Sequence, residues 1–110
     1  MGVKVFKKYL PMTETAYYIL LALREELHGY GIILSVEKVT DGRIRIGPGT
    51  IYGTLSKLED DKLIEVVREE NRRKVYIHTE LGKELLKREI DRLEELYKQG
   101  MEWRNQYVGI

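Results

Sequence analysis

Residue types that support covalent catalysis are scarce in this chain of 110 residues. It has no cysteine and two histidines, which excludes thiolate zinc sites, cysteine nucleophiles and a histidine-only metal cage. Ser35 and Ser56 stand outside a nucleophile-elbow motif, and the glycines over positions 42–53 are not followed by the Lys-Ser/Thr pair of a phosphate loop. His28 stands near a predicted helix terminus, so we expect it to be a structural residue. We therefore expect a protein that is not an enzyme and needs no metal or cofactor.

The polar residues of the segment 48–60 are the strongest candidates for binding chemistry. Pro48 suits the first position of a helix, and Ile51, Leu55 and Leu58 then fall on one side of it. The opposite and flanking residues are small, hydroxylated or basic: Thr50, Tyr52, Gly53, Ser56 and Lys57. Such side chains suit contacts with base edges and phosphates when a helix enters a DNA major groove. The alternative is an ordinary solvated helix face.

A second candidate region is a basic run further along the chain. Arg72, Arg73 and Lys74 follow one another at the start of an expected strand, and Arg68 adds a fourth positive charge to the same expected hairpin. Basic residues in such a hairpin can pair with phosphates or enter a minor groove. The neighbouring acidic residues leave a salt-bridged hairpin open as the alternative: Glu65, Glu69 and Glu70. Near the N-terminus, the lysines at positions 4, 7 and 8 could add phosphate contacts or belong to a frayed arm.

Apolar periodicity predicts the helices that position these side chains. Thr13 is the expected N-cap of a helix over residues 14–27, and a second helix follows over about 29–40. The third helix covers residues 48–60, and the last runs from residue 80 to about 104 behind Thr79 as its cap.

Period-two patterns predict the extended segments. Residues 43–47 indicate a short strand or an extended linker, and residues 63–68 and 73–78 indicate two strands joined by a turn over 69–72. In the second strand, Val75 and Ile77 should face opposite to Tyr76 in a half-buried alternation.

Three helices followed by a two-stranded hairpin are typical of a winged helix-turn-helix, and three motifs make the match specific. Residues 47–64, which begin Gly-Pro-Gly-Thr-Ile-Tyr-Gly, resemble the recognition-helix segment of the PadR-like transcriptional regulators. His-Gly-Tyr-Gly-Ile at 28–32 resembles that family's entry to its second helix, and Thr-Glu-Leu-Gly at 79–82 resembles the junction after its wing. The motifs occur in the family order, and the resemblance spans about residues 13–90.

The chain departs from the family pattern at three places. Lys62 stands where the family usually has glycine, so the turn after the third helix is expected to be tighter or differently shaped. The wing turn is short and acidic, without a glycine-rich insert, and His78 replaces a common leucine. None of these positions lies in the recognition helix, so they bear on the wing contacts alone.

The resemblance implies a mostly α fold with a small β-hairpin. It divides the chain into an N-terminal arm (1–12), a winged-helix DNA-binding domain (13–79) and a C-terminal dimerisation helix (80–110). The implied function is a sequence-specific transcriptional regulator, expected to be a repressor that binds a near-palindromic operator as a homodimer. The residues expected at the DNA are Thr50, Tyr52, Gly53, Ser56, Lys57, Arg72, Arg73 and Lys74. The alternative is a winged-helix protein-interaction module without DNA binding, and a basic face shared by the third helix and the hairpin would favour DNA.

The last helix has its own pattern. About 25 residues span roughly 37 Å, which is longer than a small domain can cover. Its six basic and seven acidic residues make it a poor nucleic-acid surface. An apolar stripe recurs every three or four residues and is the expected dimer interface: Leu86, Ile90, Leu93, Tyr97 and Met101. The alternative is a helix folded back on its own core.

Two aromatic residues near the C-terminus extend this stripe. Because some compact PadR-like relatives bind flat aromatic or cationic compounds at the dimer interface, the resemblance makes Trp103 and Tyr107 candidates for an effector pocket. Their alternative role is packing within the dimer. The net charge of +1 implies no partner by itself, and the absence of a signal-peptide or membrane-span pattern predicts a cytoplasmic protein.

Overall fold

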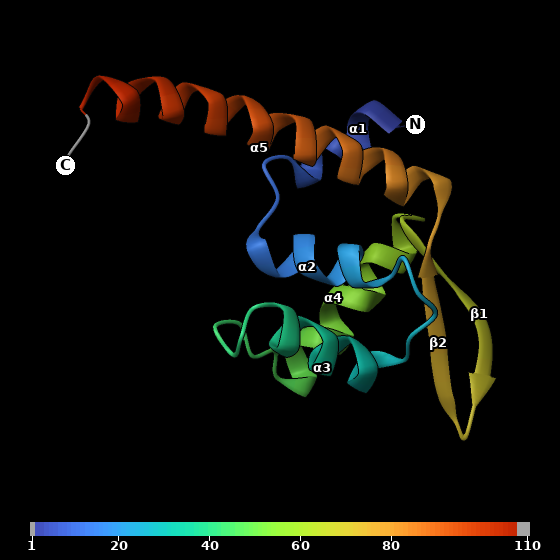
Figure 1. Ribbon diagram of the computed structural model, residues 1–110. Helices are drawn as coiled ribbons and strands as arrows, with labels where there is room; N and C mark the ends of the chain where they lie inside the picture. Colours follow the sequence, from blue (N-terminus) through green and yellow to red (C-terminus); the bar gives the residue numbers. More distant parts are fainter. Residues whose placement is uncertain (1, 108–110) are drawn as a thin grey trace.

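The elements follow one another as expected for a winged helix-turn-helix, with one additional helix at the start. A computed structural model describes residues 2–107. The elements are α1 (Gly2–Tyr9), α2 (Glu14–Ala22), α3 (Gly29–Val39), α4 (Pro48–Asp60), β1 (Ile64–Glu70), β2 (Arg73–His78) and α5 (Glu80–Gln106). In Figure 1, α2, α3 and α4 stack together beside the hairpin, and α5 crosses above them and extends past them toward the C-terminus. The predicted mostly α fold with a small hairpin is confirmed.

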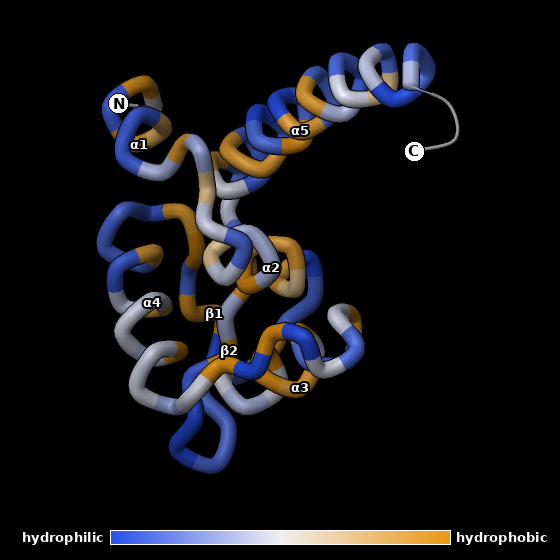
Figure 2. The backbone as a smooth tube through the Cα atoms, turned by 90° about the vertical axis from the view of Figure 1, so that its left-hand side faces the viewer, coloured by the Kyte–Doolittle hydropathy of each residue, from blue (hydrophilic) through white to orange (hydrophobic). Residues whose placement is uncertain are grey.

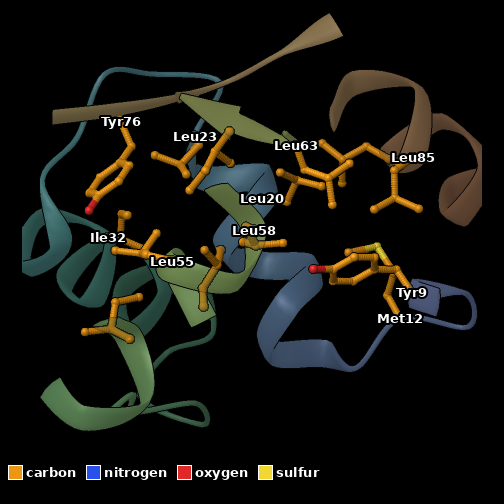
Figure 3. Close-up of a cluster of buried hydrophobic side chains, with 14 of the residues drawn as sticks. Tyr9, Met12, Leu20, Leu23, Ile32, Leu55, Leu58, Leu63, Tyr76 and Leu85 are labelled. Carbon is orange, nitrogen blue, oxygen red and sulfur yellow. The ribbon is translucent and has the colours of Figure 1, made fainter. Parts of the chain in front are cut away.

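One apolar cluster unites the three central helices with the hairpin. Its fully buried members come from every one of these elements, as Figure 3 shows for part of the set: Ile19, Leu20, Leu23, Ile32, Ile51, Leu55, Leu58, Leu63, Ile64 and Leu85. The helical spacing of these residues in the sequence is what turns one face of each helix inward. The inner face predicted for α4 is therefore confirmed, and its opposite face is left to solvent.

The predicted end of the first long helix was wrong. That helix ends at Ala22 instead of continuing through residue 27. Leu27 instead exchanges two backbone hydrogen bonds with Tyr76 of β2, of 2.8 and 3.1 Å, and the His78 amide donates to Leu23 at 3.0 Å. Pairing with the strand replaces the helical bonds, so a tertiary contact decides where α2 stops.

The half-buried alternation predicted for β2 was also wrong, because Val75 and Tyr76 are only 2% and 6% exposed. β2 lies between β1 on one side and Leu27 on the other. Arg68 of β1, which lies opposite Val75 in the ladder, forms an ion pair with Glu26, the residue before Leu27. Residues 43–47 form the extended linker of the two predicted alternatives, with Ile46 buried.

The turn after α4 has the backbone shape that a glycine would favour, although Lys62 occupies it. Lys62 has a φ of 61°, in the left-handed region. Its amide donates to Glu59 at 2.9 Å, and the Leu63 amide donates to Leu58 at 3.0 Å. This pair of bonds is the Schellman arrangement that ends many helices. The turn therefore keeps the shape expected for glycine, and Lys62 adopts the left-handed backbone conformation that is strained for a residue with a side chain.

The start of α5 is fixed to that same turn. The Thr79 hydroxyl accepts from the Gly82 amide at 3.1 Å and donates to the Lys62 carbonyl at 2.7 Å, which confirms the predicted cap. A Cβ on Gly82 would collide with the carbonyl oxygen of Leu63. Only glycine fits this approach of α5 to the hairpin.

The N-terminal segment is a helix, where only an arm was predicted. Phe6 and Tyr9 of α1 are buried, and the Arg88 guanidinium of α5 lies 4.6 Å from the Phe6 ring centroid. Phe6 thus lies against α5, and the Tyr9 hydroxyl bonds to Asp61 at the end of α4. Sequence periodicity over eight residues could not reveal these contacts.

Candidate nucleic-acid interface

Helix α4 offers solvent a polar face that no other described element covers. Ile51, Leu55 and Leu58 face the core, while Thr50, Gly53, Ser56 and Lys57 are exposed and Tyr52 is about half exposed. Pro48 occupies the first turn, and Gly47 caps the helix without a side-chain hydrogen bond. The exposed residues are those predicted for DNA contact, and the small glycine among them permits close approach of a ligand to the helix backbone.

The hairpin tip adds three basic residues beside this face, on which Lys57 is exposed. Asn71 and Arg72 form a two-residue loop with φ values of 50° and 65°, the pattern of a type I′ turn. Within residues 2–107, Arg72, Arg73 and Lys74 form no ion pair at 4 Å or less, and all three are exposed. Figure 2 shows the strongly hydrophilic tip below the rest of the hairpin.

Arg68 does not belong to this free positive charge. It forms ion pairs with Glu26 and, at 2.6 Å, with Glu70, and these partners raise its pKa. The salt-bridged hairpin therefore describes Arg68 and Glu70, the last of which ends β1 opposite Arg73. The three cations at its tip remain available to an external anion.

A hollow of about 360 Å³ connects the hairpin tip to α4. It is lined by Gly29, Tyr52, Arg72, Arg73, Lys74 and Tyr76. The fold thus brings Tyr52 together with the three predicted basic residues. Thr50, Gly53, Ser56 and Lys57 lie along α4 outside this lining.

Tyr52 is held in place by a glycine that the sequence analysis did not assign to the site. A Cβ on Gly29 would lie 2.9 Å from the Cε1 atom of Tyr52, so the tyrosine ring packs directly on the start of α3. The first glycine of the His-Gly-Tyr-Gly motif is therefore the surface on which Tyr52 rests. His28 caps the same helix, its Nδ1 accepting from the Gly31 amide at 3.1 Å, which confirms its structural role.

The far end of α4 is anchored by α1. The Tyr9 hydroxyl donates to Asp61 at 2.6 Å and the Lys8 ammonium donates to the same oxygen at 2.9 Å. These two donors lower the pKa of Asp61, while burial and the carboxylate raise the pKa of Tyr9. Lys57 lies near this cluster, its Nζ atom 5.6 Å from the Tyr9 ring centroid. Lys8 thus belongs to a helix that packs on the protein instead of to a frayed arm, and it pairs with Asp61.

Helix α5 divides into an inner and an outer part. Leu85, Leu86 and Glu89 are buried, and Arg92 neutralises Glu89 through two bonds of 2.7 and 2.8 Å. Leu86, predicted at the dimer interface, is 7% exposed because it packs into the core of its own chain.

Beyond Glu89 the predicted stripe faces solvent. Leu93 is 38% and Tyr97 64% exposed, Ile90 is exposed and Met101 is partly so. Leu96, which the sequence analysis did not include, is exposed on the same part of the helix.

The predicted effector residues lie near the end of α5. The Trp103 and Tyr107 ring centroids are 4.9 Å apart. A shallow hollow of about 310 Å³ is lined by Tyr97, Gly100, Met101, Trp103 and Arg104, so Trp103 belongs to it and Tyr107 packs against Trp103 from outside.

Two other kinds of site find no support among the described residues. Residues 2–107 contain no group of three His, Asp or Glu side chains arranged to hold a metal ion. None of the helices they form has the length and apolarity to cross a membrane.

Comparison with known proteins gives the same result from sequence and from structure. The family model for the transcriptional regulator PadR-like family matches residues 19–88. The transcriptional regulator YqjI of Escherichia coli strain K12 is 35% identical over 71 residues, which cover 64% of this chain and 34% of that protein. The chain spans 20% and 34% of the length of the curated relatives it matches.

Solved structures extend the likeness over nearly the whole chain. A PadR family transcription regulator from Clostridium difficile R20291 is 25% identical with a TM-score of 0.61, covering 88% of this chain and 100% of that chain. A transcriptional regulator from Clostridium thermocellum is 24% identical with a TM-score of 0.66, covering 96% of this chain and 98% of that chain. The geometry of α3, α4 and the hairpin described above is therefore a shared fold.

Proposed function

We infer the function of this chain from its membership of the PadR-like family of transcriptional regulators, to which it belongs. We propose that it binds double-stranded DNA, with α4 in the major groove and the hairpin tip on the flanking backbone. In this proposal, Thr50, Tyr52 and Ser56 meet base edges, and Gly53 permits close approach of the helix to the duplex. Arg72, Arg73 and Lys74 meet phosphates or the minor groove.

One observation carries this proposal: an exposed polar helix face lies beside three cations that have no ion pair within residues 2–107. A duplex presents regularly spaced negative charge, and unpaired basic side chains are the feature that attracts it. A protein-interaction module without DNA binding is the alternative, and an apolar or acidic face over α4 and the hairpin would have favoured it. The basic tip favours DNA.

The proposal includes a homodimer formed through α5. The exposed apolar residues Ile90, Leu93 and Tyr97 support it, because their burial against a second copy would remove them from water. A two-fold dimer reads two half-sites about 34 Å apart, which corresponds to a near-palindromic operator. A dimer bound at a promoter would block polymerase access, so we propose a repressor, with Trp103 and Tyr107 as the candidate effector contacts.

Selection of bound fragments from genomic DNA tests the sequence-specific part of the proposal. We expect a recurrent near-palindromic motif among the fragments. Recovery of fragments without a shared motif would contradict sequence-specific reading by α4.

Replacement of single basic residues tests the proposed orientation. Lys57→Ala or Arg73→Ala should weaken binding to every duplex sequence and reduce the slope of log affinity against log salt by about one. Arg68→Ala is the matched control, because Arg68 is already paired with two glutamates and should leave the slope unchanged. Wild-type affinity and slope in both test variants would overturn the assignment of α4 and the hairpin.

A further inference from the structure

The side of α5 that faces the core continues beyond the winged helix as an open surface. Leu85 and Glu89 are buried on this side. At 100° per residue, four later residues lie on the same side of the helix, within about 80° of one another: Leu93, Leu96, Gly100 and Trp103. Leu93, Leu96 and Trp103 are 38%, 52% and 56% exposed, because α5 there extends past the other helices (Figure 1). The pattern of a core contact thus continues where residues 2–107 supply no core.

A hollow of about 210 Å³ opens between α2 and α5 at the start of this surface. Aromatic and apolar residues form much of its lining: Met12, Tyr17, Tyr18 and Leu93. Its charged residues are already paired, Glu89 with Arg92 and Glu14 with Arg43. Its volume is below the roughly 300–1,000 Å³ of most small-molecule sites. A single large, uncharged side chain is therefore the occupant that this hollow fits.

A second hollow lies further along the same surface. It has a volume of about 310 Å³ and contains Gly100, where a Cβ would meet nothing within 4 Å. The missing side chain leaves room for one that comes from another helix.

The position of the winged helix on α5 decides how two copies can pair. Because the winged helix lies on the same side of α5 as the open surface, a parallel pair would bring the two winged helices to the same place. An antiparallel pair around a two-fold axis places them at opposite ends. The two outer parts, residues 90–106, overlap completely only when the axis passes residue 98. In this register Leu96 faces Gly100 of the second copy, and Leu93 faces Trp103 of the second copy.

Each hollow then faces a side chain of the second copy. Leu96 enters the space at Gly100, as side chains of paired helices enter holes on the facing helix. Trp103 reaches the hollow between α2 and α5, whose tyrosine rings and methionine thioether suit an indole ring. One two-fold axis thus accounts for both hollows.

We propose that Trp103 of each copy occupies the hollow between α2 and α5 of the other copy. The proposal rests on the homodimer of the proposed function and adds to it a register and a contact with the winged helix. This contact holds each winged helix against the α5 of the second copy, so it sets the spacing between the two α4 helices. An aromatic effector that stacks on Trp103 has to displace the contact, which links effector binding to that spacing.

Fluorescence tests the position of the indole directly, because Trp103 is the only tryptophan of the chain. We expect the emission of the dimer to move to longer wavelength when Tyr17→Ala opens the hollow. The dissociation constant of the dimer should rise at least about tenfold, as for a central interface residue. Tyr30→Ala is the matched control, since it removes an exposed tyrosine from the start of α3, and it should change neither property.

Trp103→Ala covers the case in which Tyr17→Ala fails to fold, because Trp103 is exposed within its own chain. It should weaken the dimer by at least about tenfold without changing the helical content. Where the double variant folds, Tyr17→Ala should add less to the dissociation constant in the Trp103→Ala background than it does alone, because the two side chains are in contact.

Cysteine cross-linking tests the register separately, since the chain has no cysteine of its own. An equimolar mixture of Leu96→Cys and Gly100→Cys proteins should form a disulfide-linked dimer on mild oxidation, because the two positions face each other. Either variant alone should not, since its two cysteines are then offset by about 6 Å along the helix. A mixture of Leu96→Cys and Lys98→Cys is the control, because residue 98 faces away from the paired surface.

The outcomes separate this inference from the proposed homodimer. A dimer that is not cross-linked in the first mixture and whose Trp103 emission ignores Tyr17→Ala would overturn the inference and leave the homodimer intact. Cross-linking without the emission change would support the register and overturn the position given to Trp103. A wild-type protein that sediments as a monomer would overturn both.

Discussion

Two exposed regions of the molecule differ in the kind of side chain that they present to solvent. One is the surface formed by α4 and the hairpin tip, and the other is the outer part of α5, residues 90–106. In the first region Ile51, Leu55 and Leu58 of α4 are buried within the chain, and apart from Tyr52 the residues left exposed are Pro48, two glycines and polar or charged residues. In the second region Ile90, Leu93 and Tyr97 are exposed. In Figure 2 this part of α5 carries hydrophobic segments where it projects beyond the other helices.

The difference shows which part of the molecule is complete in one chain. The winged helix closes its own core, so its exposed face is free to hold whatever residues binding requires. The outer part of α5 has apolar residues without a core to enter, and contiguous exposed apolar side chains mark contact surfaces. The principal extents of 55, 35 and 21 Å reflect this projecting helix.

The largest effect is expected from Leu93→Asp, in the outer part of α5. We expect a folded, largely monomeric protein whose affinity for its operator falls by at least about a hundredfold, because two linked half-sites become two separate ones. A carboxylate in a seam between two copies would also be buried without a partner. Sedimentation, circular dichroism and operator titration measure the three properties.

Lys98→Asp is the matched control, since it places the same carboxylate about 140° around the helix from Leu93. It should remain dimeric. A Leu93→Asp protein that stays dimeric and binds its operator tightly would contradict the role given to the outer part of α5.

Gly82→Ala tests whether the inner part of α5 belongs to the winged helix. The new methyl group would collide with the Leu63 carbonyl oxygen, which is backbone and cannot turn aside. We expect a loss of about 3 kcal/mol in the free energy of unfolding, at the upper end for an overpacked site. Denaturant titration measures it.

Gly100→Ala, in the outer part of α5, is the control. A Cβ there meets nothing within 4 Å, so this change should not reduce helix stability. Equal destabilisation by the two alanines would show that α5 is uniform along its length.

Lys62→Gly tests the turn that joins α4 to the hairpin within the winged helix. Glycine adopts the φ of 61° without the steric cost that lysine meets, so the variant should be more stable by about 1 kcal/mol. The thermal midpoint of the variant and wild type gives the comparison. A destabilised variant would mean that the lysine side chain contributes more than its backbone costs.

The smallest expected effect concerns the anchor of α4 on α1. Because Tyr9 and Lys8 lower the pKa of Asp61, ionised Asp61 stabilises the folded state at neutral pH. That contribution is present above the pKa of about 4 in the unfolded chain and disappears as pH falls through the lower pKa of the folded state. Between pH 6 and pH 2, Asp61→Asn should therefore lose about 0.5–1 kcal/mol less stability than the wild type. An identical loss of stability in both proteins would contradict a stabilising role for ionised Asp61.

Much of the architecture was predictable from the sequence because local signals agree with one another. Pro48 at the start of α4, Thr79 before α5 and the spacing of Ile51, Leu55 and Leu58 each act within one or two turns of a helix. Such signals depend on neighbours along the chain, and the bounds of α3, α4, β2 and α5 were predicted to within about two residues. The family motifs, read from the same segments, correctly indicated a winged helix.

The apolar faces follow from the order of residues along the chain, whereas the partner of each apolar or polar group depends on how the elements pack. Leu27 was predicted to be helical but instead forms two backbone hydrogen bonds with Tyr76. Leu86 was predicted to lie in the dimer interface but is buried in the core of its own chain. Gly29 and Tyr76 entered the candidate site through packing against residues distant in sequence, which no spacing rule registers. Burial and hydrogen bonding depend on the surfaces that the fold brings together, whereas helical periodicity depends only on the chain itself.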